Sequence, residues 1–440
     1  MKKFTLFTIL LLLAFNVAQA QWSELGGNNS LTANDDILAI ETDDSGNIYV
    51  AGDFKNSSNQ QYVSKFDGTS WTILGNPNYF SSRIQSMHFT NGKLYVAGGM
   101  NFVAVYDGNS WTQLGGDNSL QADDSINIVT SDNNGNIYAA GYFKNSNNVL
   151  YVAKFDGTSW SELGGTDSFN ENGSSIHDIA FDSQNNAYVV GDFLNNGNAY
   201  VAKFDGTTWT SLPSLSGVAD FGANSLQAIE IDANDNIYTA GYLVNGSFNN
   251  FVAKYDGTNW SELGGVNSLS ESGYIYTLNI DNNNNIYIGG SFGNSSGNKY
   301  IANYNGNTWN ELSGDNSLMA NDIIQDMVIT NDNKLAVVGN FTNTSGNQYV
   351  AITDNQILSI NDFHKESKIS FLIDYTTNTL QINPNNELIT ELSIYAINGQ
   401  KLKSYGKEIL NIDISTLSEG FYLLNIKTSN EIITRKFIKK

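Results

Sequence analysis

The chain has 440 residues, of which 40% are hydrophobic and 15% charged, and its net charge at neutral pH is −22. It contains no cysteine, which excludes disulfide bonds and thiolate metal ligands. Forty glycines against three prolines, with 12% aromatic residues, indicate a folded β-rich protein and not a disordered acidic chain. Residues 21–360 carry a net charge of −25 and residues 361–440 carry +1, so the larger part should repel nucleic acid and anionic membranes.

The first twenty residues have the features of an export signal. Two lysines precede an apolar run over residues 6–14, and the Ala-Gln-Ala triplet at 18–20 fits a cleavage motif. We therefore expect residues 1–20 to be a signal peptide, cleaved between Ala20 and Gln21. No later segment reaches the ~20 apolar residues of a membrane-spanning helix, so we expect no transmembrane segment in the mature protein.

A repeat follows directly. All seven tryptophans occupy the same place in it: Trp22, Trp71, Trp111, Trp160, Trp209, Trp260 and Trp309. Their spacings of 49, 40, 49, 49, 51 and 49 residues are typical of a β-propeller or a related repeat array. Each full unit has four strand signals, so the period predicts four antiparallel strands per blade.

The last two strand signals of each unit flank an Asp-Gly or Asn-Gly pair, such as the one at 156–157. This pair predicts a tight two-residue hairpin with both residues in the turn. Counting outward from that turn, Trp160 should lie opposite Ala153, and Trp209 opposite Ala202. A small residue beneath a large ring is a packing pair, so we interpret these tryptophans as structural.

The innermost-strand signal occurs seven times, which predicts an all-β, seven-bladed β-propeller over residues 21–358. The chain begins with an outer strand at Trp22 that has no blade of its own, while the last unit has a degraded outer strand. We expect the first strand to complete the seventh blade, with Trp22 opposite Ala351. The alternative is that residues 356–360, with Leu358 in the place of the tryptophan, complete it instead.

The second strand of each unit follows a turn of the form D-x-x-G-N-x-Y-x-x-G, as in DDSGNIYVAG and DANDNIYTAG. This form resembles the repeats of secreted bacterial β-propellers, and the resemblance covers about residues 21–358. It implies an architecture but no function.

The C-terminal segments LSIYAINGQKLKSY, IDISTLSEGFYLLNIKT and RKFIKK resemble the C-terminal sorting domain of the type IX secretion system. Its motif residues here are Gly399, Leu417, Gly420, Tyr422, Lys439 and Lys440. We expect a linker at 359–368 and a small β-sandwich over 369–440, with strands at 369–374, 379–383, 391–397, 409–414, 420–427 and 431–438. The alternative is an ordinary accessory β domain.

That resemblance implies a route and a partner. The type IX secretion machinery would recognise the C-terminal domain after export to the periplasm, and the protein would reach the outer-membrane surface or the extracellular space. The domain is commonly removed afterwards in this family.

Little in the sequence points to catalysis. The chain has no cysteine to act as a nucleophile, and we interpret His88 and His177 as packing or channel-lining residues. The acids on predicted innermost strands, Glu41, Asp178, Glu230 and Asp326, could form a glycosidase-type pair or merely line a wet channel, and we favour the second. The D-x-x-G-N turns lack the closing glutamate of a calcium loop. We therefore expect no enzyme, no cofactor and no metal site.

Three functions remain open: a surface binding or adhesion module for a glycan or a surface protein, a polysaccharide lyase or hydrolase, and a structural surface-layer component. The long loops all leave the blades at one face, where ligands are usually bound. Two entering loops there break the pattern of the repeat, and they contain Tyr79, Phe80 and Phe221. We expect these aromatic residues to be exposed, as candidates for contact with a glycan or a protein ligand; the alternative is plain drift of surface loops.

Overall fold

The computed structural model describes residues 22–357 and 370–439, apart from short gaps. The gaps are 118, 167–168, 170–172, 196, 216–222, 266–268, 270–272, 315–316, 355, 375–376, 385–387, 397–399, 407–409, 419 and 429–431. The chain divides into two compact units, residues 1–358 and 359–440. Both are built from strands, and the described residues include a short 3-10 turn, η1 (Gly27–Asn29), and no α-helix.

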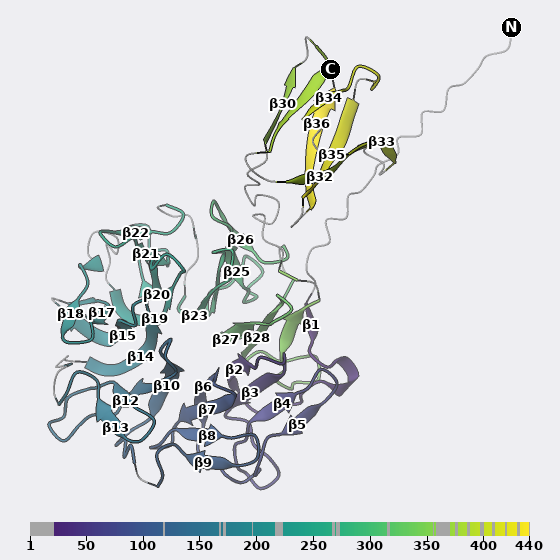
Figure 1. Ribbon diagram of the computed structural model, residues 1–440. Coiled ribbons are helices and arrows are strands. Elements are labelled where there is room, and N and C mark those ends of the chain that lie inside the picture. Colours follow the sequence, from purple (N-terminus) through teal and green to yellow (C-terminus); the bar gives the residue numbers. More distant parts are fainter. Residues whose placement is uncertain are drawn as a thin grey trace. The chain divides into compact units, whose positions relative to one another are not determined.

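The first unit is a β-propeller. Its described residues form seven antiparallel sheets, each with four strands in blade order and one with a short fifth strand, β16 (Asn198–Ala199). Figure 1 shows these sheets around a common centre, with the innermost strands nearest to it. The innermost strands are β2 (Ile37–Thr42), β6 (Ile84–Thr90), β10 (Ile126–Ser131), β14 (Gly173–Phe181), β19 (Ala223–Ile231), β23 (Ile275–Ile280) and β27 (Ile324–Ile329).

The outer three strands of each blade follow the repeat closely. The second strands are β3 (Ile48–Gly52), β7 (Lys93–Gly98), β11 (Ile137–Gly141), β15 (Ala187–Asn195), β20 (Ile237–Leu243), β24 (Ile286–Gly290) and β28 (Leu335–Gly339). The third strands are β4 (Ser64–Phe66), β8 (Ala104–Tyr106), β12 (Ala153–Phe155), β17 (Ala202–Phe204), β21 (Ala253–Tyr255), β25 (Ala302–Tyr304) and β29 (Ala351–Thr353). The outermost strands all begin at a tryptophan: β1 (Trp22–Glu24), β5 (Trp71–Ile73), β9 (Trp111–Gln113), β13 (Trp160–Glu162), β18 (Trp209–Ser211), β22 (Trp260–Glu262) and β26 (Trp309–Glu311).

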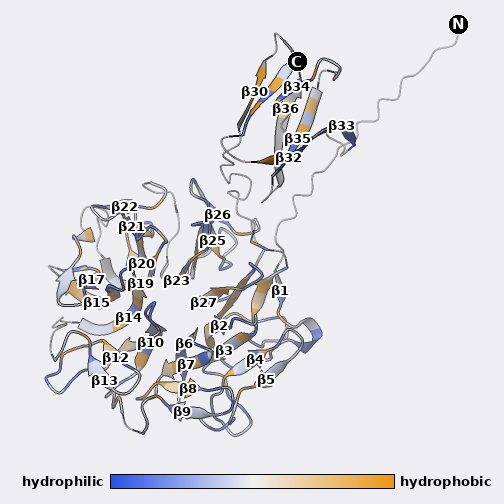
Figure 2. Ribbon diagram, in the orientation of Figure 1, coloured by the Kyte–Doolittle hydropathy of each residue, from blue (hydrophilic) through white to orange (hydrophobic). Residues whose placement is uncertain are grey.

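The apolar core lies between neighbouring blades. At the boundary of the third and fourth blades, for example, Tyr138 packs in one cluster with Ile176 and Val189. Figure 2 shows hydrophobic colour concentrated on the strands and hydrophilic colour in the loops. Because each sheet buries both faces against its neighbours, the second strands are buried along their whole length, as in β3 and β24.

The first strand closes the ring, as the sequence predicted. β1 pairs with β29 in the sheet of β27 and β28, and Ala336 and Val338 pack in one cluster with Ile37 of the first blade. Leu358, the alternative residue for the tryptophan's place, lies outside the described residues. Joining the two ends of the chain in one sheet removes the free edges that an open array would leave.

The predicted register of the outer hairpins is wrong by two residues. Trp160 pairs with Phe155, and Ala153 pairs with Glu162. In the seventh blade, Trp22 pairs with Thr353 and not with Ala351.

The reason is the position of the turn. The backbone of Asp156 bonds to that of Ser159, so Gly157, with a φ of 95°, is the first central residue of the turn and Asp156 precedes it. The Asp156 carboxylate accepts the N–H groups of Thr158 and Ser159, at 2.8 and 2.9 Å, which fixes this arrangement. A shift of two residues keeps Trp160 on its face but places it on an aromatic ring, with 5.3 Å between ring centroids.

The second unit has two small sheets around one core. One sheet contains β30 (Ser370–Asp374), β31 (Thr379–Asn383) and β34 (Asn411–Asp413), and the other contains β33 (Lys401–Tyr405), β32 (Ile389–Ala396), β35 (Gly420–Thr428) and β36 (Ile432–Lys439). Each of the six predicted strands coincides with one of these, and β33 was missed because Lys401 and Lys403 weaken its apolar pattern. This is the β-sandwich expected for residues 369–440.

Candidate functional site: the mouth of the central channel

The repeated turn residues have structural roles. In the fifth blade, one carboxylate oxygen of Asp232 accepts the N–H groups of Asn234 and Asn236 at 2.8 and 3.0 Å. The other accepts the Asn236 side-chain amide at 2.8 Å and the Tyr238 hydroxyl at 3.1 Å. The same network occurs around Asp43, Asp132, Asp182 and Asp281. Both oxygens are thus engaged by the chain itself, and no group of three His, Cys, Asp or Glu side chains in the described part could hold a metal ion.

The repeated tryptophans and glutamates also join structural elements. Six indole N–H groups donate to a backbone carbonyl of the preceding blade, as Trp160 does to Leu114 at 3.1 Å. The glutamate two residues after the tryptophan accepts the side-chain amide of an asparagine in the loop between the second and third strands. Glu162 binds Asn145 in this way, and Glu24 of β1 binds Asn343 at 3.3 Å in the seventh blade. These residues hold the blades and loops together and are not available to a ligand.

A β-bulge interrupts each innermost strand. The pairing with the second strand skips one residue in every blade, as at Leu38 between Ile37 and Ala39. The skipped residue is the second of the innermost strand in five blades and the fifth in β14 and β19. A glycine of the second strand lies opposite the bulge. A Cβ on Gly52 would lie 2.1 Å from the carbonyl oxygen of Asp36, so only glycine fits there. This close approach explains the last glycine of the D-x-x-G-N-x-Y-x-x-G form.

The bulges bring the seven skipped side chains into one cavity of about 340 Å³ at the end of the channel. These side chains are Leu38, Gln85, Asn127, His177, Gln227, Tyr276 and Gln325, and Asp36, Arg83 and Tyr142 complete the lining. We call this cavity the channel mouth. It lies at the end where the entering loops join the innermost strands, which is the long-loop end of the blades.

The mouth is rich in side-chain amides. Gln85 donates to the side chain of Asn127 at 3.4 Å, and Gln325 donates to the side chain of Asn340 at 2.8 Å. Gln227 donates to the Ser225 hydroxyl at 2.6 Å. Within the described residues, the three glutamines make hydrogen bonds only through their amino groups, which leaves three carbonyl oxygens as free acceptors.

Tyrosines form the second component of the mouth. Tyr276 lines the cavity, and its ring is parallel to that of Tyr274, with an angle of 6° and 5.8 Å between centroids. Tyr274 in turn contacts Tyr242 at 5.0 Å. Tyr142 lines the cavity from the third blade and is 41% exposed, and Tyr274 is 39% exposed. We call Tyr242, Tyr274 and Tyr276 the tyrosine shelf.

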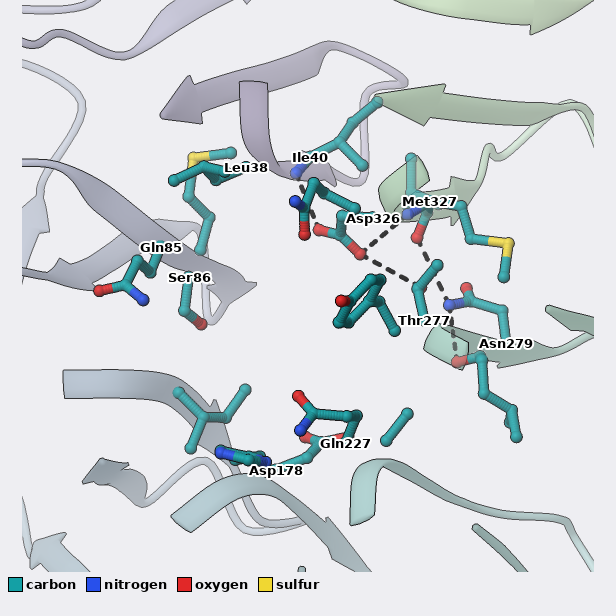
Figure 3. Close-up of a pocket in the computed structure, with 18 of the residues that line it drawn as sticks. Leu38, Ile40, Gln85, Ser86, Asp178, Gln227, Thr277, Asn279, Asp326 and Met327 are labelled. Atoms are coloured by element: carbon teal, nitrogen blue, oxygen red, sulfur yellow. Dashed lines mark hydrogen bonds between the residues drawn. The ribbon is translucent and has the colours of Figure 1, made fainter. Parts of the chain in front are cut away.

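The four acids predicted on innermost strands do meet in the channel, deeper than the mouth, in a cavity of about 340 Å³. Figure 3 shows Asp178 and Asp326 on opposite sides of it. Each acid bonds to backbone: Asp326 accepts the N–H of Ile40 at 3.0 Å, and Asp178 accepts that of Ile229 at 2.9 Å. Both bonds cross to the next blade, so these carboxylates link neighbouring blades.

Burial inside the propeller is the main influence on the pKa values of these four acids. It raises the pKa of Glu41, Asp178 and Asp326 to about 7 and the pKa of Glu230 to about 8. Repulsion adds to it, because Asp178 raises the pKa of Glu230. The Glu41 side chain is nevertheless 20% exposed, because the channel admits water. Contact with this water limits the increase in the pKa of Glu41. Near neutral pH the channel therefore holds both protonated and ionised carboxyl groups.

One cluster has the composition of a catalytic triad but not its geometry. His177 Nε2 lies 2.8 Å from the Ser175 hydroxyl and 3.3 Å from Asp192, while Nδ1 faces the carbonyl of Leu226 at 3.0 Å. Ser175 is fully buried, so its oxygen cannot reach a substrate, and the orienting carboxylate of a triad is replaced by a backbone carbonyl. Although desolvation opposes it, hydrogen bonds from His177 and neighbouring serines hold the pKa of Asp192 well below its usual range.

The aromatic residues proposed for the long-loop face need a correction. Phe80 is 2% exposed and packs against Trp111 with centroids 5.0 Å apart, so the expectation that it is exposed is wrong. Tyr79 is half-buried and stacks on the same indole at 6.3 Å. The second blade lacks a long loop between its second and third strands, and these rings fill that space. Phe221 lies outside the described residues.

The sorting-domain residues collect around the core of the second unit. Tyr422 stacks on Phe437 at 5.6 Å and donates to the carbonyl of Ser418, and Leu417 packs against the same core. Lys439 is buried and binds Asn378. Gly420 begins β35. Gly399 and Lys440 lie outside the described residues, as do Ala20 and Gln21 of the expected cleavage site.

Sequence reasoning missed the mouth because its residues share a position but not a residue type. The signal was present, since the skipped position of the innermost strand holds an amide, an imidazole, a phenol or leucine in the seven units. Its orientation depends on the bulge, which no local pattern announces.

The fold is a β-propeller with a lined central channel, followed by a small β-sandwich. The sequence profile of the DUF6242 beta propeller domain matches residues 18–305, and that of the secretion system C-terminal sorting domain matches residues 376–440. Because the first match covers more than half of the chain, the protein belongs to the DUF6242 β-propeller family. The second match identifies a type IX sorting domain, so the protein is secreted or displayed at the cell surface.

Solved structures agree on the fold. PorZ, a bacterial surface component of the type IX secretion system of Porphyromonas gingivalis, is 12% identical with a TM-score of 0.52 over 93% of this chain. The chain spans 60% of the length of PorZ. YCF48 from Cyanidioschyzon merolae is 12% identical with a TM-score of 0.52, over 76% of this chain and 99% of its own. YCF48 bound to D1 peptide is 13% identical with a TM-score of 0.53, over 77% and 96%. At these identities the likeness shows the fold alone.

Two further findings complete the comparison. The chain has no significant match among curated proteins. None of the helical segments in the described residues is long and apolar enough to cross a membrane.

Proposed function

We propose that the protein is a surface-displayed or released binding module that holds its ligand at the channel mouth. The observation that carries this proposal is that repeated and unrepeated residues of the repeat have different roles. The repeated turn aspartates and outer-strand tryptophans are occupied by contacts within the chain, whereas unrepeated amide and tyrosine side chains meet at one cavity. A rigid scaffold with variable polar and aromatic groups at one end is the usual form of a binding site.

We further propose that the protein is not an enzyme. The channel acids that would serve a lyase or hydrolase accept backbone N–H groups: Asp326 from Ile40, and Asp178 from Ile229. Their oxygens are oriented by the blades and not toward a reacting bond. Incubation of neutral polysaccharides with the protein should release no reducing ends. Release that stops in the Asp178→Asn or Asp326→Asn variant would establish the hydrolase alternative.

A protein ligand is the second class to be considered. YCF48, a propeller of similar fold, is recorded bound to a peptide, and PorZ is a surface component of a secretion system. The test is a parallel screen of the purified full-length chain against immobilised glycans and immobilised peptides. The double variant Gln85→Ala/Gln325→Ala should lose binding at least about tenfold, because it removes two free acceptors at the mouth. Unchanged binding by this variant would remove the mouth as the site, whereas no binding to any glycan or peptide would favour the structural surface-layer alternative.

The C-terminal domain should act as a transport address by way of the periplasm. Deleting residues 366–440 should leave a folded propeller that accumulates in the periplasm of the producing cell. Normal delivery of this truncated chain to the surface or medium would contradict the proposed route.

A further inference from the structure

The tyrosine shelf lies beside an opening. Tyr274 directly precedes β23 (Ile275–Ile280), and Tyr276 is the bulged residue of that strand. The two rings lie parallel. Tyr242 extends the shelf from the end of β20 in the preceding blade. Three adjacent rings, one of them lining the mouth and one 39% exposed, present apolar faces with polar edges to a ligand.

The mouth supplies hydrogen-bond groups for a ligand end. The cavity of about 340 Å³ lies within the range of small-ligand pockets and has room for about one ring-sized group. The side-chain oxygens of Gln85, Gln227 and Gln325 are free acceptors in it. Acceptors arranged around a ring suit hydroxyl groups that point outward from a small cyclic molecule.

Charge narrows the ligand class further. Arg83 is the one cationic side chain that lines the mouth in the described residues, and it is paired with Asp53. The channel acids lie below, and residues 21–360 carry a net charge of −25, so an anionic ligand would be repelled. Leu38 is the sole aliphatic side chain in the described lining. The mouth therefore offers little aliphatic surface for an apolar side chain of a protein ligand to bind.

We propose that the tyrosine shelf and the channel mouth together bind a neutral saccharide chain. A pyranose ring would stack on Tyr274, the exposed ring of the shelf, and the terminal residue would enter the mouth beside Tyr276 and donate its hydroxyls to Gln85, Gln227 and Gln325. Stacking uses the C–H face of the sugar, and the amides satisfy its polar rim. This inference rests on the proposed function, since it names the ligand class of the same site.

The experiment measures binding of the full-length chain to neutral tetrasaccharides by calorimetry. The probes are tetrasaccharides of glucose, mannose, galactose, xylose or N-acetylglucosamine, each tested alone. We expect at least one to bind, Tyr274→Ala to weaken it by about tenfold or more, and Tyr274→Phe to remain within about threefold, because phenylalanine keeps the stacking face. Ile73→Ala is the matched control, since Ile73 is 44% exposed on an outermost strand away from the mouth.

Each other outcome overturns the inference in a distinct way. Binding of peptides but not of tetrasaccharides, lost in Gln85→Ala/Gln325→Ala, would leave the proposed function intact and exclude the saccharide. Tetrasaccharide binding that is lost in Phe221→Ala but not in Tyr274→Ala would place the site on the entering loop of the fifth blade. Binding insensitive to all of these variants would overturn both the saccharide inference and the mouth as the ligand site.

Discussion

The two ends of the propeller blades use the same repeat in opposite ways. At the tight-turn end, the aspartate, asparagine and tyrosine of the second-strand turn recur in five blades and make the same bonds in each. At the long-loop end, one position holds leucine, glutamine, asparagine, histidine and tyrosine in turn. The comparison shows that repetition within one chain can separate structural residues from candidate functional ones. A position that must make one contact keeps its residue, and a position that faces a shared cavity does not.

Acidic residues follow the same division. Desolvation alone would raise the pKa of Asp232, but hydrogen bonds from Asn236, Asn234 and Tyr238 outweigh it and hold the pKa low. In the channel, burial prevails and raises the pKa of Glu230 to about 8. Ionisation of Asp232 therefore stabilises the folded state, whereas ionisation of Glu230 destabilises it.

The largest expected effect comes from Asp232→Ala at the tight-turn end. The change leaves two backbone N–H groups, the Asn236 amide and the buried Tyr238 hydroxyl without their acceptor, which should lower the free energy of unfolding by about 3 kcal/mol. Denaturant titration measures it. Asp256→Ala is the matched control, since that carboxylate accepts two N–H groups but is fully exposed and water can replace it. Equal losses for both variants would contradict the structural role of the turn network.

The Gly52→Ala variant should show the next largest loss of stability. The new methyl group would lie 2.1 Å from the Asp36 carbonyl oxygen and would force the bulge apart, at a cost of about 2 kcal/mol. Gly406→Ala is its control, because a methyl group there meets nothing within 4 Å. Thermal unfolding of both variants gives the comparison. A stable Gly52→Ala protein would show that the bulge does not need glycine.

Ser313→Gly tests whether every departure from the repeat is functional. Ser313 occupies a place where five other units have a glycine with positive φ. Its own φ is 72°, and its buried hydroxyl has no partner among the described residues. Ser313→Gly removes both the unfavourable φ of a non-glycine residue and the buried hydroxyl without a partner. The variant should therefore raise the free energy of unfolding by about 1 kcal/mol without affecting ligand binding.

Ser317→Gly should instead lower stability, since the Ser317 hydroxyl donates to Leu312 at 2.8 Å. Denaturation midpoints measure the stabilities of the two variants relative to the parent protein. A loss of binding in Ser313→Gly would show that this departure, too, serves the ligand site.

The channel acids are tested by the pH dependence of the stability of the Glu230→Gln variant. A carboxyl group whose pKa is raised from 4.5 to about 8 binds a proton more tightly in the folded state, so stability falls as the pH rises between these values. The variant should therefore be more stable than the parent above about pH 8 and should lose this advantage below about pH 4. Stability measured from pH 4 to 9 provides the test. An advantage that grows as the pH falls would reverse the assignment of a buried, protonated carboxyl group.

The sequence by itself determined the architecture. The tryptophan spacing, the alternating strand signals and the orphan strand at Trp22 are local or periodic features, and they predicted the blades, their closure by β1 and the separate C-terminal domain. Local chemistry suffices there because strand period and turn residues act within a few positions of the chain. The four channel acids were also found in advance, as residues that depart from the repeat on innermost strands.

Only the tertiary structure decided register, burial and the site. The hairpin turn is set by whether Asp156 or Gly157 leads it, and the two choices differ by two residues in pairing with Trp160. Phe80 is buried because the second blade lacks a loop that the other blades use to fill the same space. The channel mouth exists because seven bulges turn residues from seven distant segments toward one axis. Such convergence depends on contacts between blades, about which the order of residues within one blade carries no information.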